Sequence, residues 1–185
     1  MRDALAEHLE LAAAMEAWLP NTDEVARELI AAYERGGQLF TCGNGGSAAD
    51  AQHLAAELVG RYSRERRPLA ATSLSVDPSV VTCIANDYSF EDVFARQVQA
   101  LAGADDVVIA FTTSGRSPNV VRALAAAREA GATTVLFGGR DGGAAAEHSD
   151  YALLVPSTNT ARIQEMHLLL LHLVIEQVDA WVAGA

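Results

Sequence analysis

Two polar residues four positions apart could carry out acid–base chemistry in this chain. His53 and Glu57 share one face of any helix that contains them, because residues at i and i+4 lie one above the other. A carboxylate beside an imidazole can act as a general base or supply two ligands to a metal ion. The same spacing is common in exposed polar pairs, so spacing alone favours a surface pair.

Gln164 and His172 form a second candidate pair near the C-terminus. Eight residues separate them, which places them about 80° apart in helical projection. Leu168 and Leu171 fall between or beside them, so the two polar side chains share an otherwise apolar face. They are either buried groups that bond to backbone or parts of a site. His167 points elsewhere and is expected to be structural; its spacing from His172 is not that of the zinc-protease motif H-E-x-x-H.

Two glycine-bearing loops could bind an anion. The first, G-N-G-G-S, ends at Ser47, which is expected to cap the following helix. It is not the dinucleotide-binding G-x-G-x-x-G, because Ala48 stands where the third glycine would be. The second loop, T-T-S-G-R-S, carries four hydroxyls in six residues, those of Thr112, Thr113, Ser114 and Ser117. Hydroxyls and N–H groups at a helix N-terminus bind phosphate, although one such loop alone is usually an ordinary turn.

Composition excludes several classes of function. The chain has 185 residues and a formal net charge of -11, and its 13 basic residues are all arginine. The absence of lysine rules out an in-chain Schiff base and a Walker-type phosphate loop, and the acidic charge argues against nucleic-acid binding. No apolar run approaches the ~18 residues that a membrane span needs, and no export signal precedes the first helix. Two cysteines, Cys42 and Cys83, make no disulfide framework. We therefore expect a cytoplasmic protein that binds neither nucleic acid nor membrane.

Periodicity and turn residues predict strands that alternate with helices after an N-terminal helical pair. Helices are expected over residues 3–19, 23–35, 47–60, 78–85, 90–102, 118–130, 142–148 and 160–183. Strands are expected over residues 38–42, 69–74, 106–111, 133–137 and 151–155. In the first helix one apolar face is expected to carry Leu5, Leu9, Ala12, Met15 and Leu19, and Pro20 should end the helix. The chain is expected to form one domain, with N-terminal helices over 1–36 and an α/β core over 37–185.

This alternation predicts an α/β fold, a doubly wound five-stranded parallel sheet covered on both faces. Ligands of such sheets bind at the carboxyl ends of the strands, at the point where the strand order reverses. If the order is 2-1-3-4-5, this point lies between the first and third strands. The two glycine-bearing loops follow these strands and would face one crevice, which favours a phosphate site over two unrelated turns.

Four longer segments carry a specific combination of motifs. They read CGNGGSAADAQHLAAELVGRY, IANDYSFEDVFARQV, TTSGRSPNVVRAL and ARIQEMHLLLLHLVIE. Together they resemble the sugar isomerase (SIS) domain family, and more narrowly its phosphoheptose isomerases. The resemblance covers nearly the whole chain. It implies a doubly wound sheet of flavodoxin-like order, a homotetramer with sites at subunit interfaces, and an aldose–ketose isomerase. The implied reaction converts sedoheptulose 7-phosphate to D-glycero-D-manno-heptose 7-phosphate through an enediol, the first step to nucleotide-activated heptose.

The resemblance also implies roles for individual residues. Glu57 would be the catalytic base and His172 the catalytic acid. Zinc, one ion per subunit, would bind His53, Glu57, Gln164 and His172. The sugar phosphate would contact Asn44, Gly45, Ser47, Arg61, Asp87, Thr112, Thr113, Ser114, Ser117 and Gln164. A glutamate that binds zinc cannot also be a free base without rearrangement, so the two roles of Glu57 stay open.

Three positions depart from the family pattern. Thr112 replaces a frequent serine but keeps the hydroxyl, and Arg116 replaces a common asparagine and adds charge near the phosphate. Ala161 stands where some members have an aspartate, which leaves the exact sugar phosphate open. Two alternatives remain: a non-enzymatic SIS-domain tetramer that binds the bacterial replication initiator, and an SIS isomerase for another sugar phosphate. The presence of His53, Glu57 and His172 together favours the enzyme over the initiator-binding protein, and the four-residue metal-like set argues against another sugar phosphate.

Overall fold

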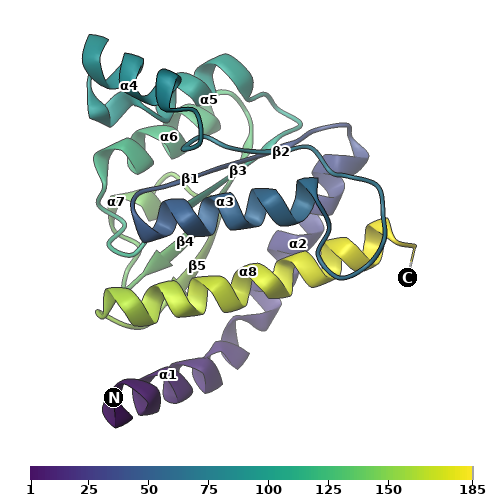
Figure 1. Cartoon of the computed structure of the whole chain (residues 1–185), viewed down its shortest axis with the longest axis vertical. Coiled ribbons are helices and arrows are strands. Elements are labelled where there is room, and N and C mark those ends of the chain that lie inside the picture. The colour runs from purple at the N-terminus through teal and green to yellow at the C-terminus, as the bar shows by residue number, and fades with distance from the viewer. Residues whose placement is uncertain (185) are drawn as a thin grey trace.

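The chain folds around one sheet of five parallel strands with helices on both faces (Figure 1). The computed structural model describes residues 1–184. The strands are β1 (Leu39–Gly43), β2 (Ala71–Ser73), β3 (Val107–Thr112), β4 (Thr133–Gly139) and β5 (Tyr151–Val155). Their order is β2-β1-β3-β4-β5, which confirms the predicted order and fold class.

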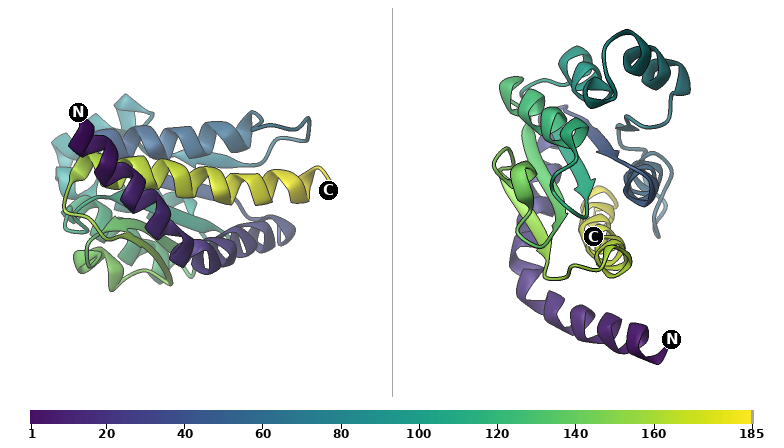
Figure 2. Two further views of the ribbon diagram at one scale, coloured as in Figure 1. Left: turned by 90° about the horizontal axis from the view of Figure 1, so that it is seen from below. Right: turned by 90° about the vertical axis from the view of Figure 1, so that its left-hand side faces the viewer.

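Two helical layers enclose the sheet (Figure 2). The first layer consists of α2 (Leu19–Glu34), α3 (Gly46–Val59) and α8 (Thr160–Val182). The second consists of α4 (Pro78–Asp87), α5 (Ala95–Leu101), α6 (Pro118–Glu129) and α7 (Gly143–Ala146). Leu39 and Ile109 pack toward the first layer, whereas Phe40 and Val108 pack toward the second, since successive side chains of a strand point to opposite faces. This double burial explains why the strands read as continuous apolar runs.

The N-terminal helices differ from the prediction in two respects. α1 (Arg2–Ala14) continues through the 3-10 turn η1 (Met15–Trp18) into α2, so Pro20 lies in the first turn of α2. Proline is tolerated there because first-turn N–H groups have no helical partner. The predicted apolar face of α1 is wrong at Leu5 and Leu9, which are each 60% exposed, whereas Leu11 and Met15 are buried. The reason is that α1 extends away from the sheet (Figure 2).

Two other elements are shorter than predicted. β2 covers only part of 69–74; at its start the N–H of Leu69 donates to the carbonyl of Leu58 at the end of α3 (3.0 Å) rather than to a strand. The helix predicted over 90–102 is divided into the 3-10 turn η2 (Phe90–Asp92) and α5. Asp92 ends the turn by accepting hydrogen bonds from Ser89 (2.6 Å) and Arg122 (2.7 Å).

The sheet register brings the ends of β1 and β3 together. Gly43 pairs with Phe111, so the loops that follow these two strands start side by side. β2 and β4 lie outside this pair, which makes the β1–β3 boundary the point where the strand order reverses. Within residues 1–184 no helix combines the length and the apolar character needed to span a bilayer.

Candidate functional site

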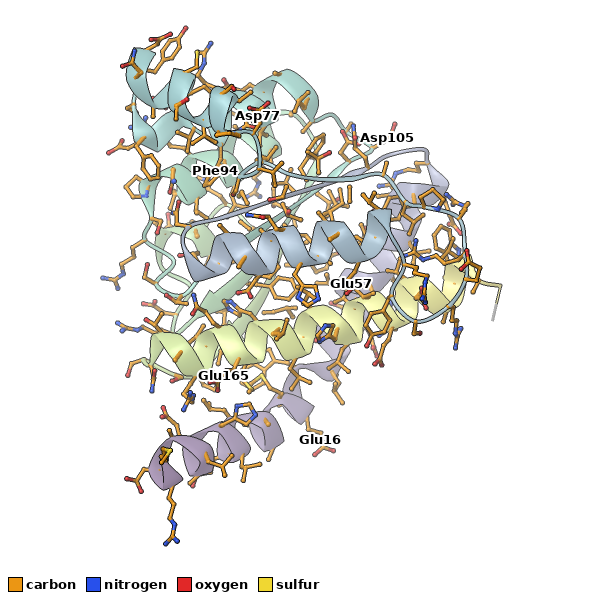
Figure 3. The ribbon with its side chains drawn as sticks, in the orientation of Figure 1. Glu16, Glu57, Asp77, Phe94, Asp105 and Glu165 are labelled. Carbon is orange, nitrogen blue, oxygen red and sulfur yellow. The ribbon has the colours of Figure 1, made fainter. Side chains whose placement is uncertain are left out.

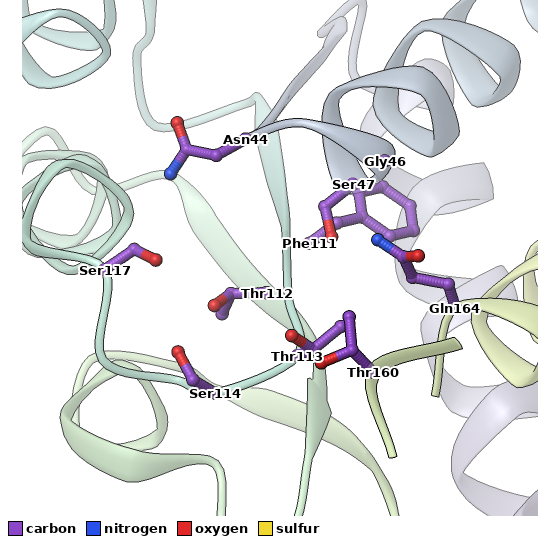
Figure 4. A pocket seen from close by; sticks show the side chains of 10 residues that line it. All are labelled: Asn44, Gly46, Ser47, Phe111, Thr112, Thr113, Ser114, Ser117, Thr160 and Gln164. Carbon is purple, nitrogen blue, oxygen red and sulfur yellow. The ribbon is translucent and has the colours of Figure 1, made fainter. Parts of the chain in front are cut away.

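A cavity of ≈ 260 Å³ lies at the carboxyl ends of β1 and β3 (Figure 4). Its walls come from both glycine-bearing loops and from the first turn of α8, so the two loops face one crevice as predicted. The lining residues are Asn44, Gly46, Ser47, Phe111, Thr112, Thr113, Ser114, Ser117, Thr160 and Gln164. Hydroxyl and amide groups predominate among them, and none carries a charge, which suits an anion bound by hydrogen bonds and helix dipoles.

The first loop turns at a glycine rather than at the predicted serine cap. Gly45, at φ 60°, is the N-cap of α3, and Ser47 lies inside the first turn, so the capping role predicted for Ser47 is wrong. The left-handed φ needs a glycine, because a side chain is strained there. Ser47 is buried with its hydroxyl on the cavity wall (Figure 4). Asn44 exchanges two amide hydrogen bonds with Asn119 of α6 (2.9 and 2.8 Å), which ties the first loop to the second.

The second loop orients its hydroxyls through backbone donors. The N–H of Gly115 donates to Thr112 Oγ1 and the N–H of Arg116 donates to Ser114 Oγ, each at 3.2 Å. Each hydroxyl thus accepts a bond within the loop and keeps its own hydrogen to donate to a ligand. Ser117 occupies the predicted N-cap of α6, but its side chain makes no capping bond. The hydroxyls lie around one space (Figure 4).

The electrostatics of the cavity come from the backbone more than from side chains. The N-termini of α3 and α6 both open onto it, and each carries the positive end of a helix dipole. Arg116, predicted to add charge near the phosphate, extends away: its side chain is 71% exposed and lies 3.8 Å from Asp141. This arrangement explains how a chain with a net charge of -11 can still attract a small anion.

α3 and α8 bring three of the candidate acid–base residues into contact. His53 Nε2 lies 3.2 Å from Glu57 Oε1, and the ring centroids of His53 and His172 are 5.1 Å apart in an edge-to-face arrangement. Glu57 lies on the side of α3 that faces α8 (Figure 3). Sequence spacing gave no indication that the two helices meet at these positions. The structure therefore favours a site over an unrelated surface pair.

Gln164 occupies a different place from the histidines. It lies at the cavity wall, where a Cβ atom on Gly46 would overlap its amide group. Eight residues of helix, about 12 Å, separate it from His172. Gln164 thus lies at the cavity end of α8, about two turns before His172 on the same helix.

The donor groups suit zinc, although their present arrangement is not that of a metal site. Two imidazoles and a carboxylate are common zinc ligands, and the amide oxygen of Gln164 is a rarer one. Across residues 1–184 no three His, Cys, Asp or Glu side chains are grouped as a metal ion would require. The His53 and Glu57 side chains, 37% and 24% exposed, face each other. Both would have to turn toward His172 to share an ion.

Asp50 is a neighbour of the candidate acid–base residues. It lies one turn before His53 on α3, and its Oδ2 atom is buried without a hydrogen-bond partner. Burial raises the pKa of Asp50 to about 6, partly offset by the nearby His53. The sequence also did not predict Asn119, which bonds Asn44, or Thr160, which lines the cavity. A single polar residue within a helical pattern does not indicate which group its side chain will face.

Arg61 and Asp87 do not line the cavity of this chain. Both are exposed, Arg61 after the end of α3 and Asp87 at the end of α4. Asp87 accepts a hydrogen bond from Asn86 Nδ2 (2.8 Å) and lies near the Cys83 thiol (3.6 Å). Their contact with substrate therefore remains a prediction.

His167 is structural, as predicted, and Cys42 is buried as well. His167 is fully buried, and its Nε2 lies 3.0 Å from the carbonyl oxygen of Gly138. Burial lowers the pKa of His167 to about 4, so its imidazole stays neutral near pH 7. Cys42 is buried within β1, and burial raises the pKa of its thiol to about 12. Neither group is a candidate for proton transfer.

Comparison with known proteins gives one consistent result. A family model described as SIS domain matches residues 6–139. A phosphoheptose isomerase of Solidesulfovibrio magneticus is 55% identical over 163 residues, which cover 88% of this chain and 79% of that protein. Another, from Paramagnetospirillum magneticum, is 48% identical over 182 residues, 98% of this chain and 95% of that protein. The structure of phosphoheptose isomerase GmhA from Neisseria gonorrhoeae matches with a TM-score of 0.92 and 40% identity, covering 97% and 96% of the two chains.

Proposed function

Since this chain belongs to the SIS-domain family, among its phosphoheptose isomerases, we propose that it converts D-sedoheptulose 7-phosphate to D-glycero-D-manno-heptose 7-phosphate. The observation that carries the proposal is that α3 and α8 hold two groups of residues. Near their N-termini both helices line the hydroxyl-lined cavity, and further along they bring His53, Glu57 and His172 into contact. The named relatives also favour an enzyme over the initiator-binding alternative.

The cavity would hold the phosphate group. Its oxygens would accept hydrogen bonds from Ser47, Thr112, Ser114 and Ser117 and from N–H groups at the starts of α3 and α6. Asn44, Gly45 and Thr113 would complete the wall, and Gln164 would contact the sugar. A phosphate fixed there would orient the carbon chain toward Glu57 and His172, and this positioning supplies much of the catalytic advantage of a bound substrate.

Glu57 and His172 would move the protons. The Glu57 carboxylate takes the proton from C1 of the ketose and returns it to C2. His172 donates a proton to the C2 oxygen and recovers one from the C1 hydroxyl as the aldehyde forms. The intermediate is an enediol, and protons balance over the cycle. Each positioned acid or base contributes about 10²- to 10⁴-fold to the rate.

Zinc fits the same residues. His53, Glu57, Gln164 and His172 would hold it, and when bound it would polarise the carbonyl and stabilise negative charge on the oxygens. While Glu57 is a ligand it cannot take a proton from carbon. Glu57, whose side chain is 24% exposed, would therefore serve either as a zinc ligand or as the base, and the two roles stay open.

The assembled enzyme would be a homotetramer in the cytoplasm with sites at subunit interfaces. The exposed Leu5 and Leu9 of α1 support burial against another copy, since exposed apolar patches mark interaction surfaces. Arg61 and Asp87, which do not line this chain's own cavity, would contact sugar in a site shared between copies. Charged sugar phosphates do not cross membranes, which supports a cytoplasmic location. The proposal includes no nucleic-acid or membrane partner.

NMR of the purified protein with sedoheptulose 7-phosphate in D₂O tests the reaction. We expect signals of the aldoheptose 7-phosphate, with deuterium at C2 because the enediol exchanges protons with solvent. A chelator should lower the rate about tenfold or more, and added zinc should restore it. The absence of turnover in zinc-replete protein would contradict the proposed reaction. A rate that does not change with chelator would show that the reaction does not need zinc.

Ser114→Ala should weaken substrate binding more than it slows chemistry. The variant loses one hydroxyl donor to the phosphate and leaves Glu57 and His172 untouched. A hydrogen bond to a charged group contributes about 1.5–3 kcal/mol, so KM should rise about tenfold or more while kcat changes about twofold or less. Ser79→Ala, on the exposed start of α4, is the matched control. Steady-state kinetics decide: an unchanged KM for Ser114→Ala would contradict the phosphate cavity.

A further inference from the structure

The segment that leaves α3, residues 61–67, lies along the face of α8 that carries His172. The Tyr62 ring is tilted by 31° against the His172 ring at a centroid distance of 5.7 Å. Its hydroxyl donates to Glu176 Oε1 (3.2 Å), one turn further along α8. Tyr62 therefore covers one side of His172.

The same segment is fixed by a buried carboxylate, Asp179, one further turn along α8. Ser63 Oγ and the N–H of Arg64 each donate to Asp179 Oδ2 (3.1 Å), and Arg66 Nε donates to Asp179 Oδ1 (3.0 Å). Burial raises the pKa of Asp179, but these hydrogen bonds outweigh it and hold the pKa below its ordinary value. The Arg66 and Asp179 side chains are 0% and 2% exposed, so the pair is enclosed. Since His172 and Asp179 are seven residues apart, they share one face of α8.

Arg66 also binds the C-terminal end of α3. Its Nη2 donates to the backbone carbonyl of Glu57 (2.6 Å), and its Nη1 donates to the carbonyls of Leu58 (2.9 Å) and Gly60 (3.3 Å). The last carbonyls of a helix lack helical partners, and a cation there is favoured by the helix dipole. One guanidinium thus joins the backbone of Glu57 to the helix that carries His172.

We propose that Arg66, through its ion pair with Asp179, is a positioning residue that holds Glu57 of α3 at its working distance from His172 of α8. The inference rests on the proposed acid–base roles of those two residues. Arg66 touches no part of the cavity and acts only through the helix ends. Burying a paired charge is costly, and the observed geometry satisfies every hydrogen-bonding nitrogen of the guanidinium.

Arg66→Gln should lower kcat by about 10- to 100-fold, because a displacement of about 1 Å between catalytic groups can cost that much. KM, and the Kd for inorganic phosphate in the cavity, should change about twofold or less, since the cavity lies at the other end of α3. The kcat of Arg66→Lys should fall between those of the wild type and Arg66→Gln, because an ammonium can pair with Asp179 but cannot also reach the carbonyls of α3. Arg67→Gln is the matched control: it removes the same charge from a neighbour that packs over Trp181, and both constants should stay near wild type.

Imidazole NMR separates failure of this inference from failure of the proposed reaction. The Cε1–H signals of His53 and His172 should shift in Arg66→Gln and Arg66→Lys but not in Arg67→Gln, with the buried His167 as an internal reference. This readout needs no turnover, so it applies even if the wild type is inactive on sedoheptulose 7-phosphate. Folded Arg66→Lys with unshifted signals and wild-type kcat would overturn the inference. A loss of phosphate binding equal to the loss of kcat would also overturn it, since that outcome reports general disruption.

Discussion

Glu57→Gln is expected to reduce kcat by about 10²- to 10⁴-fold while KM and the oligomeric state stay unchanged. The amide keeps the shape of the side chain and can still bond His53, which lies 3.2 Å away, but it cannot accept a proton from carbon. NMR progress curves give kcat, and size-exclusion chromatography with light scattering gives the mass of the assembly. Glu129→Gln, an exposed glutamate at the end of α6, is the control for the lost charge and should behave as wild type.

His172→Ala extends the same test to the acid. It should reduce kcat to a similar degree, with His148→Ala as the control outside the site. Metal analysis of Glu57→Gln distinguishes the two roles of Glu57. If the inactive variant retains zinc, Glu57 acts as the base. If the inactive variant has lost zinc, Glu57 acts as a zinc ligand. Near-wild-type kcat in Glu57→Gln or His172→Ala would remove the proposed acid–base pair.

The hydroxyl-lined cavity was predictable from sequence because topology determines it. Helices and strands that alternate require a parallel sheet, and the order β2-β1-β3-β4-β5 places the ends of β1 and β3 side by side. The loops after these strands could be recognised by glycines and hydroxyls. The predicted N-cap of α3 was nevertheless wrong. The helix begins after Gly45, whose positive φ favours glycine, and Ser47 lies inside its first turn. A sequence that contains both glycines and hydroxyls does not show which residue caps the helix.

The acid–base residues were predictable as candidates but not as a group. His53 and Glu57 share a helix face by spacing, but their contact with His172 depends on how α3 packs against α8. Arg66 bridges the two helices, with hydrogen-bond partners on α3, on α8 and in its own segment. An arginine within a basic loop looks solvated in sequence, because its burial depends on contacts across 113 residues. The residue-level link between the two helices therefore needed the structure.

Gly115→Ala should damage the hydroxyl-lined cavity although it removes none of the side-chain hydroxyls. Gly115 has φ 65°, and a Cβ atom there would overlap the carbonyl oxygen of Gly142. The strain of a left-handed residue costs about 1–2 kcal/mol, and relief of the overlap requires the loop to move away from the turn at Gly142. We expect a loss of about 3 kcal/mol in the free energy of unfolding and a rise in KM of about 10²-fold. Urea denaturation at one protein concentration and steady-state kinetics measure the two effects.

Gly36→Ala supplies the control, since it has the same kind of strain without the overlap. Gly36 has φ 89°, and no heavy atom lies within 4 Å of a Cβ placed there. It should lose about 1 kcal/mol of stability and keep its KM. The comparison tests whether the loop backbone or the hydroxyls alone make the proposed phosphate site. In Gly115→Ala the side chains of Thr112 and Ser114 are intact, but the N–H groups of Gly115 and Arg116 that orient their hydroxyls are displaced. A wild-type KM in that variant would mean that the hydroxyls suffice without this backbone geometry, whereas the expected rise would mean that the loop backbone prepares them for the ligand.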